Sequence, residues 1–183
     1  AVFGAVGTAG QRCTSTRRLI IHESIFDKVI EAIKSAYAQL KIGSPLLAEN
    51  HVGPLIDEAA VSMYLSALDA VDAAGGIFHL RGGKLEGAEY ASGCYVKPSI
   101  AEVQNDWSIV QHETFAPILY LMQYDTLDEA IALQNGVRQG LQTAFWENGK
   151  KRFEYTAVND AYEGELKEWA ENGKLFHLAH YKN

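Results

Sequence analysis

The sequence predicts an α/β fold, with a largely parallel sheet and helices packed on it. Two observations support this class. Segments typical of strands alternate with segments of helical periodicity, and the stretch APILYLMQY, residues 116–124, is almost continuously apolar. Such a run is typical of a central strand buried on both faces, as in a parallel sheet. We expect no internal repeat and no linker, and therefore a single domain over residues 1–183.

The first elements can be taken in chain order. Residues 1–10 are small and apolar, which favours a short helix or turn. Residues 17–22, RRLIIH, are rich in strand-forming residues and are predicted to join the same sheet as the apolar run. A helix should follow with Ser24 as its N-cap, because apolar residues then recur at helical spacing as far as Leu40. Gly43 should lie beyond its end.

The middle of the chain continues the alternation. Asp57 is expected to cap a second helix, which ends at Gly75. Residues 76–83, GIFHLRGG, predict a short strand and a turn. Residues 93–100, GCYVKPSI, predict an extended segment, and Pro98 within it suits a strand end.

The last third is expected to follow the same plan. Thr126 and Glu129 form a capping box for a third helix. Residues 141–146, LQTAFW, should be a strand. Residues 161–172 are interpreted as a helix, and residues 174–181, KLFHLAHY, as a closing strand.

Composition excludes several classes of function. The formal net charge of −7 argues against a nucleic-acid-binding surface, for which a basic excess is expected. No apolar run is long enough to cross a membrane. The two cysteines, Cys13 and Cys94, are too far apart in sequence to indicate a disulfide framework, which favours a reducing, cytoplasmic location. His177 and His180 would face opposite sides of a strand, so no metal site is expected.

Cys13 is the leading candidate for a reactive residue. It lies in GTAGQRCTSTRRL, residues 7–19, where glycines leave room for a substrate and Arg12, Arg17 and Arg18 supply positive charge. Positive charge favours the thiolate, which is the nucleophilic form of cysteine. The alternative is a structural cysteine in the core, which is how we interpret Cys94.

Two motifs carry a resemblance to a known family. GTAGQRCTSTRRLIIHESIFDKV, residues 7–29, closely resembles the catalytic-cysteine region of the NAD(P)-dependent aldehyde dehydrogenases. Its GQRCT core is most similar to the α-aminoadipic semialdehyde (piperideine-6-carboxylate) dehydrogenase branch. ETFAPILY, residues 113–120, resembles the Glu-x-Phe-x-Pro motif of the same superfamily. The resemblance covers residues 1–141, whereas residues 142–183 are not recognised.

The resemblance implies a role for each matched residue. Cys13 would attack an aldehyde to form a thiohemiacetal, hydride would pass to NAD, and water would hydrolyse the resulting thioester. The backbone N–H of Cys13 would belong to the oxyanion hole. Glu113 would bind the hydroxyls of the nicotinamide ribose, and Phe115 would pack against the nicotinamide ring. Pro117 would fix the backbone behind that ring.

The same resemblance implies that several functional parts of the family lie outside residues 1–183. The family's general-base glutamate, its oxyanion-hole asparagine and its dinucleotide-binding domain would all lie upstream of residue 1. We therefore expect a catalytic-domain portion of an aldehyde dehydrogenase that is inactive as this chain alone. Its partners would be a small-molecule aldehyde and either further copies of itself or the remainder of a longer chain.

Two other classes of function stay open from the residues. One is a non-enzymatic scaffold or binding module built on the same fold. The other is a cysteine hydrolase, which would need His22 or His112 as a base close to Cys13.

Overall fold

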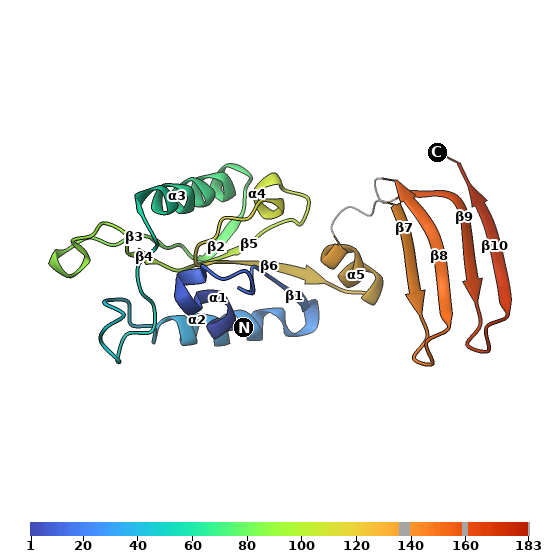
Figure 1. The fold of residues 1–183 in the computed structure, drawn as a ribbon, viewed down its shortest axis with the longest axis horizontal. Coiled ribbons are helices and arrows are strands. Elements are labelled where there is room, and N and C mark those ends of the chain that lie inside the picture. The colour runs from blue at the N-terminus through green and yellow to red at the C-terminus, as the bar shows by residue number, and fades with distance from the viewer. Residues whose placement is uncertain (136–139, 159–160, 183) are drawn as a thin grey trace. The chain divides into compact units, whose positions relative to one another are not determined.

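The computed structural model describes residues 1–135, 140–158 and 161–182. The chain divides into two compact units, Ala1–Ala130 and Ile131–Asn183, where the sequence predicts one domain. Figure 1 shows the elements of both units along the chain. The two units, here unit 1 and unit 2, are described separately.

Unit 1 is built on a four-stranded sheet with the order β1-β6-β5-β2. The central strand β6 is parallel to both β1 and β5, and the edge strand β2 is antiparallel to β5. The α/β class and the central place of the apolar run are thereby confirmed, and Leu119 and Leu121 on β6 are 0% exposed. The strands are β1 (Arg18–His22), β2 (Ile77–Leu80), β5 (Ser99–Glu102) and β6 (Ile118–Tyr124).

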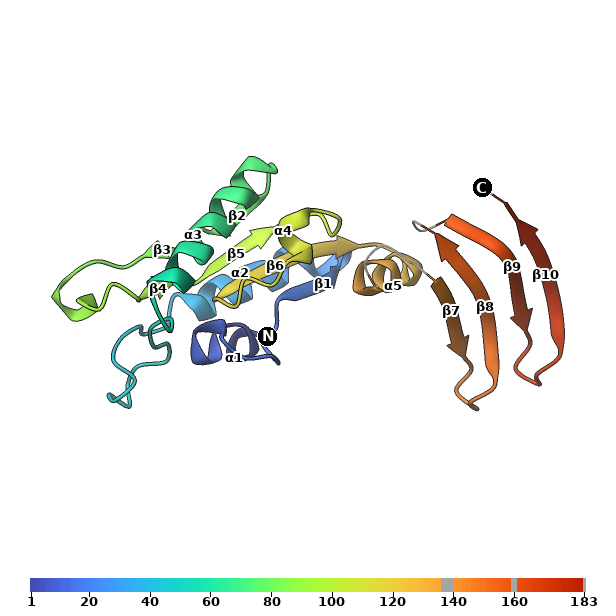
Figure 2. The same cartoon turned by 45° about the horizontal axis from the view of Figure 1, so that its top comes forward.

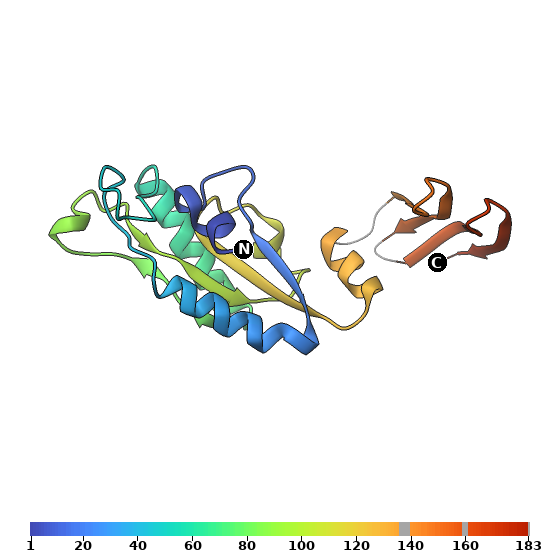
Figure 3. The ribbon, with the colours of Figure 1, turned by 90° about the horizontal axis from the view of Figure 1, so that it is seen from below.

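Helices cover both faces of this sheet. Figures 1 and 2 show α1 and α2 on one face, with α3 and α4 on the other, and Figure 3, seen from below, shows α2 on the side of the sheet that faces the viewer. A 3-10 turn, η1 (Gly7–Gly10), follows α1 directly. The helices are α1 (Val2–Val6), α2 (Phe26–Tyr37), α3 (Glu58–Ala73) and α4 (Ser108–Gln111).

The predicted helix starts were right in two cases and wrong in one. Asp57 caps α3, since its carboxylate accepts a hydrogen bond from the Ala60 N–H at 2.8 Å. Glu129 and Thr126 form the expected capping box of α5 (Leu127–Asn135). Ser24 does not cap α2. It lies inside a 3-10 turn, η2 (Glu23–Ile25), and its own N–H donates to the Nδ1 of His22 at 3.2 Å, so His22 caps this turn.

Short elements complete unit 1. β3 (Gly83–Lys84) pairs with β4 (Val96–Lys97), and η3 (Ala88–Tyr90) lies in the loop that joins them. Pro98 separates β4 from β5, as its lack of an N–H donor predicts. Among the residues described, no helix combines the length and the apolar character needed to span a bilayer.

Unit 2 contains a four-stranded antiparallel sheet in chain order. The expected strands near 141–146 and 174–181 are confirmed, but the predicted helix over 161–172 is wrong, because β9 occupies most of it. Gly164 disfavours a helix there, and β9 pairs with a strand on each side, so tertiary pairing overrides the local pattern. The strands are β7 (Gly140–Phe145), β8 (Lys151–Val158), β9 (Ala161–Trp169) and β10 (Leu175–Tyr181).

The cap of α3 gives a first testable expectation. Replacing Asp57 by alanine should destabilise α3 by about 1 kcal/mol, because the Ala60 N–H loses its acceptor. Ser24→Ala is the matched control, and it should cost less because no α2 backbone donor depends on that side chain. Native-state hydrogen exchange in the two helices measures both effects, and equal losses would contradict the assignment of Asp57 as the cap.

Candidate active site

The parallel pairing of β1 with β6 brings two distant sequence segments together. Arg18 pairs with Tyr120, and the Tyr120 N–H donates to the Arg17 carbonyl at 2.9 Å. Because the strands run in the same direction, the residues that precede each strand meet at one end of the sheet. The Cys13 loop precedes β1, and residues 113–117 precede β6, so both recognised motifs lie at that end.

The Cys13 loop is anchored by close backbone packing at Gly10. Gly10 has φ +69°, and a Cβ there would lie 2.5 Å from the Ala116 carbonyl oxygen. Thr8 and Ala9 are also left-handed, with φ of 54° and 53°. Non-glycine residues in this region cost about 1–3 kcal/mol each and cluster at functional sites. The loop therefore holds a strained conformation directly against the second motif.

A tight turn presents Cys13 to solvent. The Arg12 N–H donates to Ser15 Oγ at 3.1 Å, and the Ser15 N–H donates back to the Arg12 carbonyl at 3.1 Å. Cys13 lies between these two residues and is exposed. Gln11 fastens the turn to a neighbouring loop by accepting from the Ile56 N–H at 2.9 Å. The turn can thus offer a thiol to an incoming molecule without first opening.

Arg17 joins the Cys13 turn to the second motif. Its guanidinium donates to the Ala116 carbonyl at 2.9 Å and to the Arg12 carbonyl at 3.4 Å. It also lies 3.9 Å from the Glu113 carboxylate and 5.3 Å from the centre of the Phe115 ring. Burial lowers the pKa of Arg17, and the charge of Glu113 acts in the opposite direction. An arginine keeps its charge at neutral pH, so Arg17 places a cation beside the Glu113 carboxylate.

Glu113 and Phe115 lie at the accessible side of the junction. The Glu113 side chain is 61% exposed, and Phe115 is 37% exposed. Phe115 has a left-handed φ of 51°, a strained conformation for an aromatic residue. Glu113 also lines a pocket of about 190 Å³, together with Arg17, Arg18, Gln111 and His112. No contact described joins Cys13 to Glu113, and Arg17 links the carbonyl of Arg12, next to Cys13 in the turn, to the Glu113 carboxylate.

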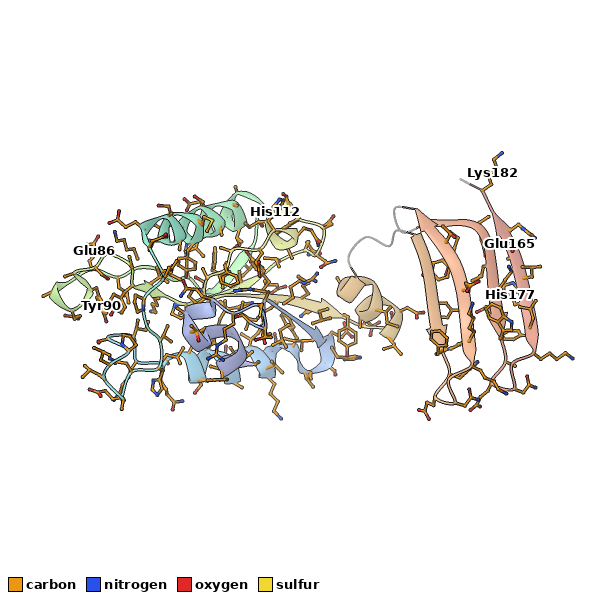
Figure 4. The ribbon with its side chains drawn as sticks, in the orientation of Figure 1. Glu86, Tyr90, His112, Glu165, His177 and Lys182 are labelled. Carbon is orange, nitrogen blue, oxygen red and sulfur yellow. The ribbon has the colours of Figure 1, made fainter. Side chains whose placement is uncertain are left out.

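The geometry gives no support to a histidine base beside Cys13. His22 ends β1, whereas Cys13 precedes its start, and the Nδ1 of His22 contacts Ser24 Oγ at 2.9 Å. His112, labelled in Figure 4, follows α4, and its Nδ1 contacts the Ser108 carbonyl at 2.9 Å. No described contact joins either ring to Cys13.

The interpretation of Cys94 as a core residue was wrong. Cys94 is only half-buried, in the loop before β4, and its Sγ contacts the Ser92 carbonyl at 3.5 Å. The role of Arg17 was also missed in part. Its place in the sequence indicates only a source of positive charge, whereas in the structure its side chain connects the two motifs. Its position at the start of the predicted strand was the one indication in the sequence that Arg17 could lie at the end of the sheet.

Comparison with known proteins agrees with these two motifs. The aldehyde dehydrogenase family model matches residues 1–161. The chain is 46% identical over 147 residues to alpha-aminoadipic semialdehyde dehydrogenase of Bos taurus. It is 45% identical over 148 residues to a putative aldehyde dehydrogenase family 7 member A1 homolog of Caenorhabditis elegans. The matches cover 80% and 79% of this chain, and the chain spans only 26% and 27% of these two relatives.

Solved structures show the same fold. Betaine aldehyde dehydrogenase of Staphylococcus aureus in complex with NAD+ superposes with a TM-score of 0.70 at 28% identity, over 76% of this chain and 28% of that chain. Methylmalonate-semialdehyde dehydrogenase of Oceanimonas doudoroffii gives a TM-score of 0.70 at 20% identity. With a family model that matches most of its residues, the chain belongs to the aldehyde dehydrogenase family.

Proposed function

We propose that this chain is the catalytic-domain portion of an NAD-dependent aldehyde dehydrogenase that oxidises an aldehyde to a carboxylate, with Cys13 as nucleophile. One observation carries the proposal. Arg17 contacts both the turn that presents Cys13 and the segment that holds Glu113 and Phe115. The similarity to semialdehyde dehydrogenases supports a semialdehyde as the substrate.

In this proposal the Cys13 thiolate adds to the carbonyl carbon of the aldehyde. The new C–S bond gives a thiohemiacetal, and the backbone N–H of Cys13 donates to the developing oxyanion. When bound, NAD supplies the hydride acceptor that turns this adduct into a thioester. Water then breaks the C–S bond, which releases the carboxylate and restores the thiol. The exposed turn at Cys13 suits the first and last of these steps, since both need an approach from outside.

Glu113 and Phe115 are proposed to hold the nicotinamide riboside. A carboxylate offers two acceptor oxygens, which suit two adjacent ribose hydroxyls. The Glu113 side chain is accessible for this, and its distance of 3.9 Å from Arg17 leaves its oxygens available. The exposed part of Phe115 offers an apolar surface to the nicotinamide ring, while Arg17 lies over its ring.

The remaining parts of the proposal concern the context of the chain. It spans about a quarter of its curated relatives, so we propose that residues 1–183 alone do not turn over substrate. We also propose a cytoplasmic location, which two free thiols support.

Acyl transfer tests the nucleophile without the cofactor. A reactive Cys13 should take an acetyl group from p-nitrophenyl acetate, because a thiolate attacks an activated ester and forms a thioester directly. Peptide mass spectrometry should find the acetyl group on Cys13, and Cys13→Ser should abolish the rapid release of nitrophenolate. Cys94→Ser is the matched control and should keep it. Acetylation confined to Cys94 would reject the proposed nucleophile.

A further inference from the structure

The sheet of unit 2 consists of two β-hairpins that repeat one turn sequence. Residues 147–150 and 171–174 are both Glu-Asn-Gly-Lys, 24 positions apart. In the first turn, the Trp146 N–H donates to the Lys150 carbonyl at 2.8 Å and the Lys150 N–H donates to Asn148 Oδ1 at 3.0 Å. The second turn makes the same two hydrogen bonds, each at 2.9 Å. The Ala170 N–H donates to the Lys174 carbonyl, and the Lys174 N–H donates to Asn172 Oδ1. The prediction of no internal repeat was therefore wrong, since this hairpin is repeated.

Strand pairing within the hairpins repeats with the same period. Ala144 on β7 pairs with Phe153 on β8, and the residues 24 positions later, Glu168 and His177, pair between β9 and β10. The irregularity at the turn is repeated as well. Phe145 pairs with Lys151 after the register shift in the first hairpin, and Trp169 pairs with Leu175 in the second. The two hairpins are therefore successive units of one repeating sheet.

The contact between the hairpins shows how one unit recognises the next. Besides the pairing of β8 with β9, Asn148 Nδ2 donates to the Glu171 carbonyl at 2.9 Å. Lys150 Nζ donates to the Asn172 carbonyl at 3.0 Å. The donors come from the turn of the first hairpin, and the acceptors come from the turn of the second.

The second hairpin presents the same donors outward. Asn172 and Lys174 correspond to Asn148 and Lys150, and among the residues that the structure describes their side-chain N–H groups donate to no acceptor. Strand β10 is the edge of the sheet and contains no proline. Natural proteins usually protect an edge strand, because its free N–H and C=O groups pair readily with another strand.

The opposite edge of the same sheet is the matching surface. Strand β7 corresponds to β9, which is the strand that the first hairpin binds. The carbonyls of Glu147 and Asn148 correspond to the two acceptors in the second turn. We propose that β10 of one copy of this chain pairs in antiparallel orientation with β7 of a second copy, and so continues the repeat between molecules.

The repeat also fixes the register of this interface. Phe153 pairs with Glu168 between the hairpins, so His177 of one copy should pair with Ala144 of the other. Figure 4 labels His177 on β10 and Glu165 on the neighbouring strand β9. An interface between two different edges is heterologous, and it generates open assemblies unless the rotation closes a ring. The proposal concerns unit 2 alone and does not depend on the chemistry of Cys13.

Disulfide trapping tests the proposal in the full chain with Cys13→Ser and Cys94→Ser. One sample carries His177→Cys and the other carries Ala144→Cys, and the two are mixed under mild oxidation. Directly paired residues on antiparallel strands have Cα atoms about 4.5–5.5 Å apart, within reach of a disulfide. A mixed disulfide dimer should form. Leu178→Cys with Ala144→Cys is the matched control, and it should form little, because neighbouring strand residues point to opposite faces.

A second variant tests the turn donors. Asn172→Asp keeps the oxygen that closes the turn and removes the outward N–H donor, so it should weaken association by about threefold to tenfold. Gln39→Glu adds the same charge to unit 1 and should leave association unchanged. Sedimentation equilibrium of the unsubstituted chain should show a mass that rises with concentration. A monomer at every concentration, or equal disulfide yields for the paired and the control cysteines, would overturn the proposal.

Discussion

Gly10→Ala is expected to lower the free energy of unfolding of unit 1 by about 3–5 kcal/mol, which removes a large part of the stability of a typical domain. Gly10 has φ +69°, and a Cβ would lie 2.5 Å from the Ala116 oxygen and 2.8 Å from the Pro117 nitrogen. Both neighbours are backbone atoms next to the start of β6. They cannot move aside as the end of a flexible side chain could, so the loop and the second motif must separate.

Gly75→Ala is the matched control. Gly75 also has a positive φ, +86°, but nothing lies within 4 Å of a Cβ built there. Its replacement should therefore cost only the left-handed backbone conformation, about 1–2 kcal/mol. Hydrogen exchange at the amides of β6 in urea measures unit 1 separately from unit 2. Equal losses for the two variants would show that the close approach at Gly10 contributes no stability.

Local pattern was enough to predict much of unit 1. The apolar run of β6 identifies a central strand, because only burial on both faces favours such a composition. Asp57 and the pair Thr126 and Glu129 identify helix starts, because capping acts within three residues. These features depend on neighbours in sequence, so the sequence carries them directly.

Features that depend on distant neighbours were missed. Residues 161–172 contain Leu166 and Trp169 at helical spacing, but pairing with β8 and β10 makes most of this segment a strand. The repeated Glu-Asn-Gly-Lys turns were a local indication of two hairpins, since Asn-Gly is a strong hairpin turn sequence. One miss was local, since the imidazole of His22 accepts the Ser24 N–H and caps the turn that precedes α2, where Ser24 itself was expected as the cap.

The candidate site was predictable only through motif resemblance. Spacing cannot bring Cys13 near Glu113, since about a hundred residues separate them. The parallel register of β1 with β6 places the two segments that precede these strands at one end of the sheet. Arg17 becomes important only in that arrangement, because its contacts are with Arg12, Glu113, Phe115 and Ala116.

The polypeptide of residues 1–183 is expected to have a reactive Cys13 and no dehydrogenase turnover. Iodoacetamide should modify Cys13 faster than Cys94, because Cys13 is exposed while Cys94 is half-buried with its Sγ against the Ser92 carbonyl. Peptide mass spectrometry at successive times gives both rates. Faster modification of Cys94 would contradict the proposed nucleophile.

Turnover requires more than an accessible thiol. The loss of a general base typically costs about 10²–10⁴ in rate, and the loss of cofactor positioning removes the oriented hydride acceptor. Because the two losses multiply, NADH absorbance should not rise when aminoadipic semialdehyde and NAD are added. Cys13→Ala serves as the blank for any background. A steady rise in NADH that disappears in Cys13→Ala would contradict the expectation, and it would mean that residues within 1–183 supply both the base and the cofactor site.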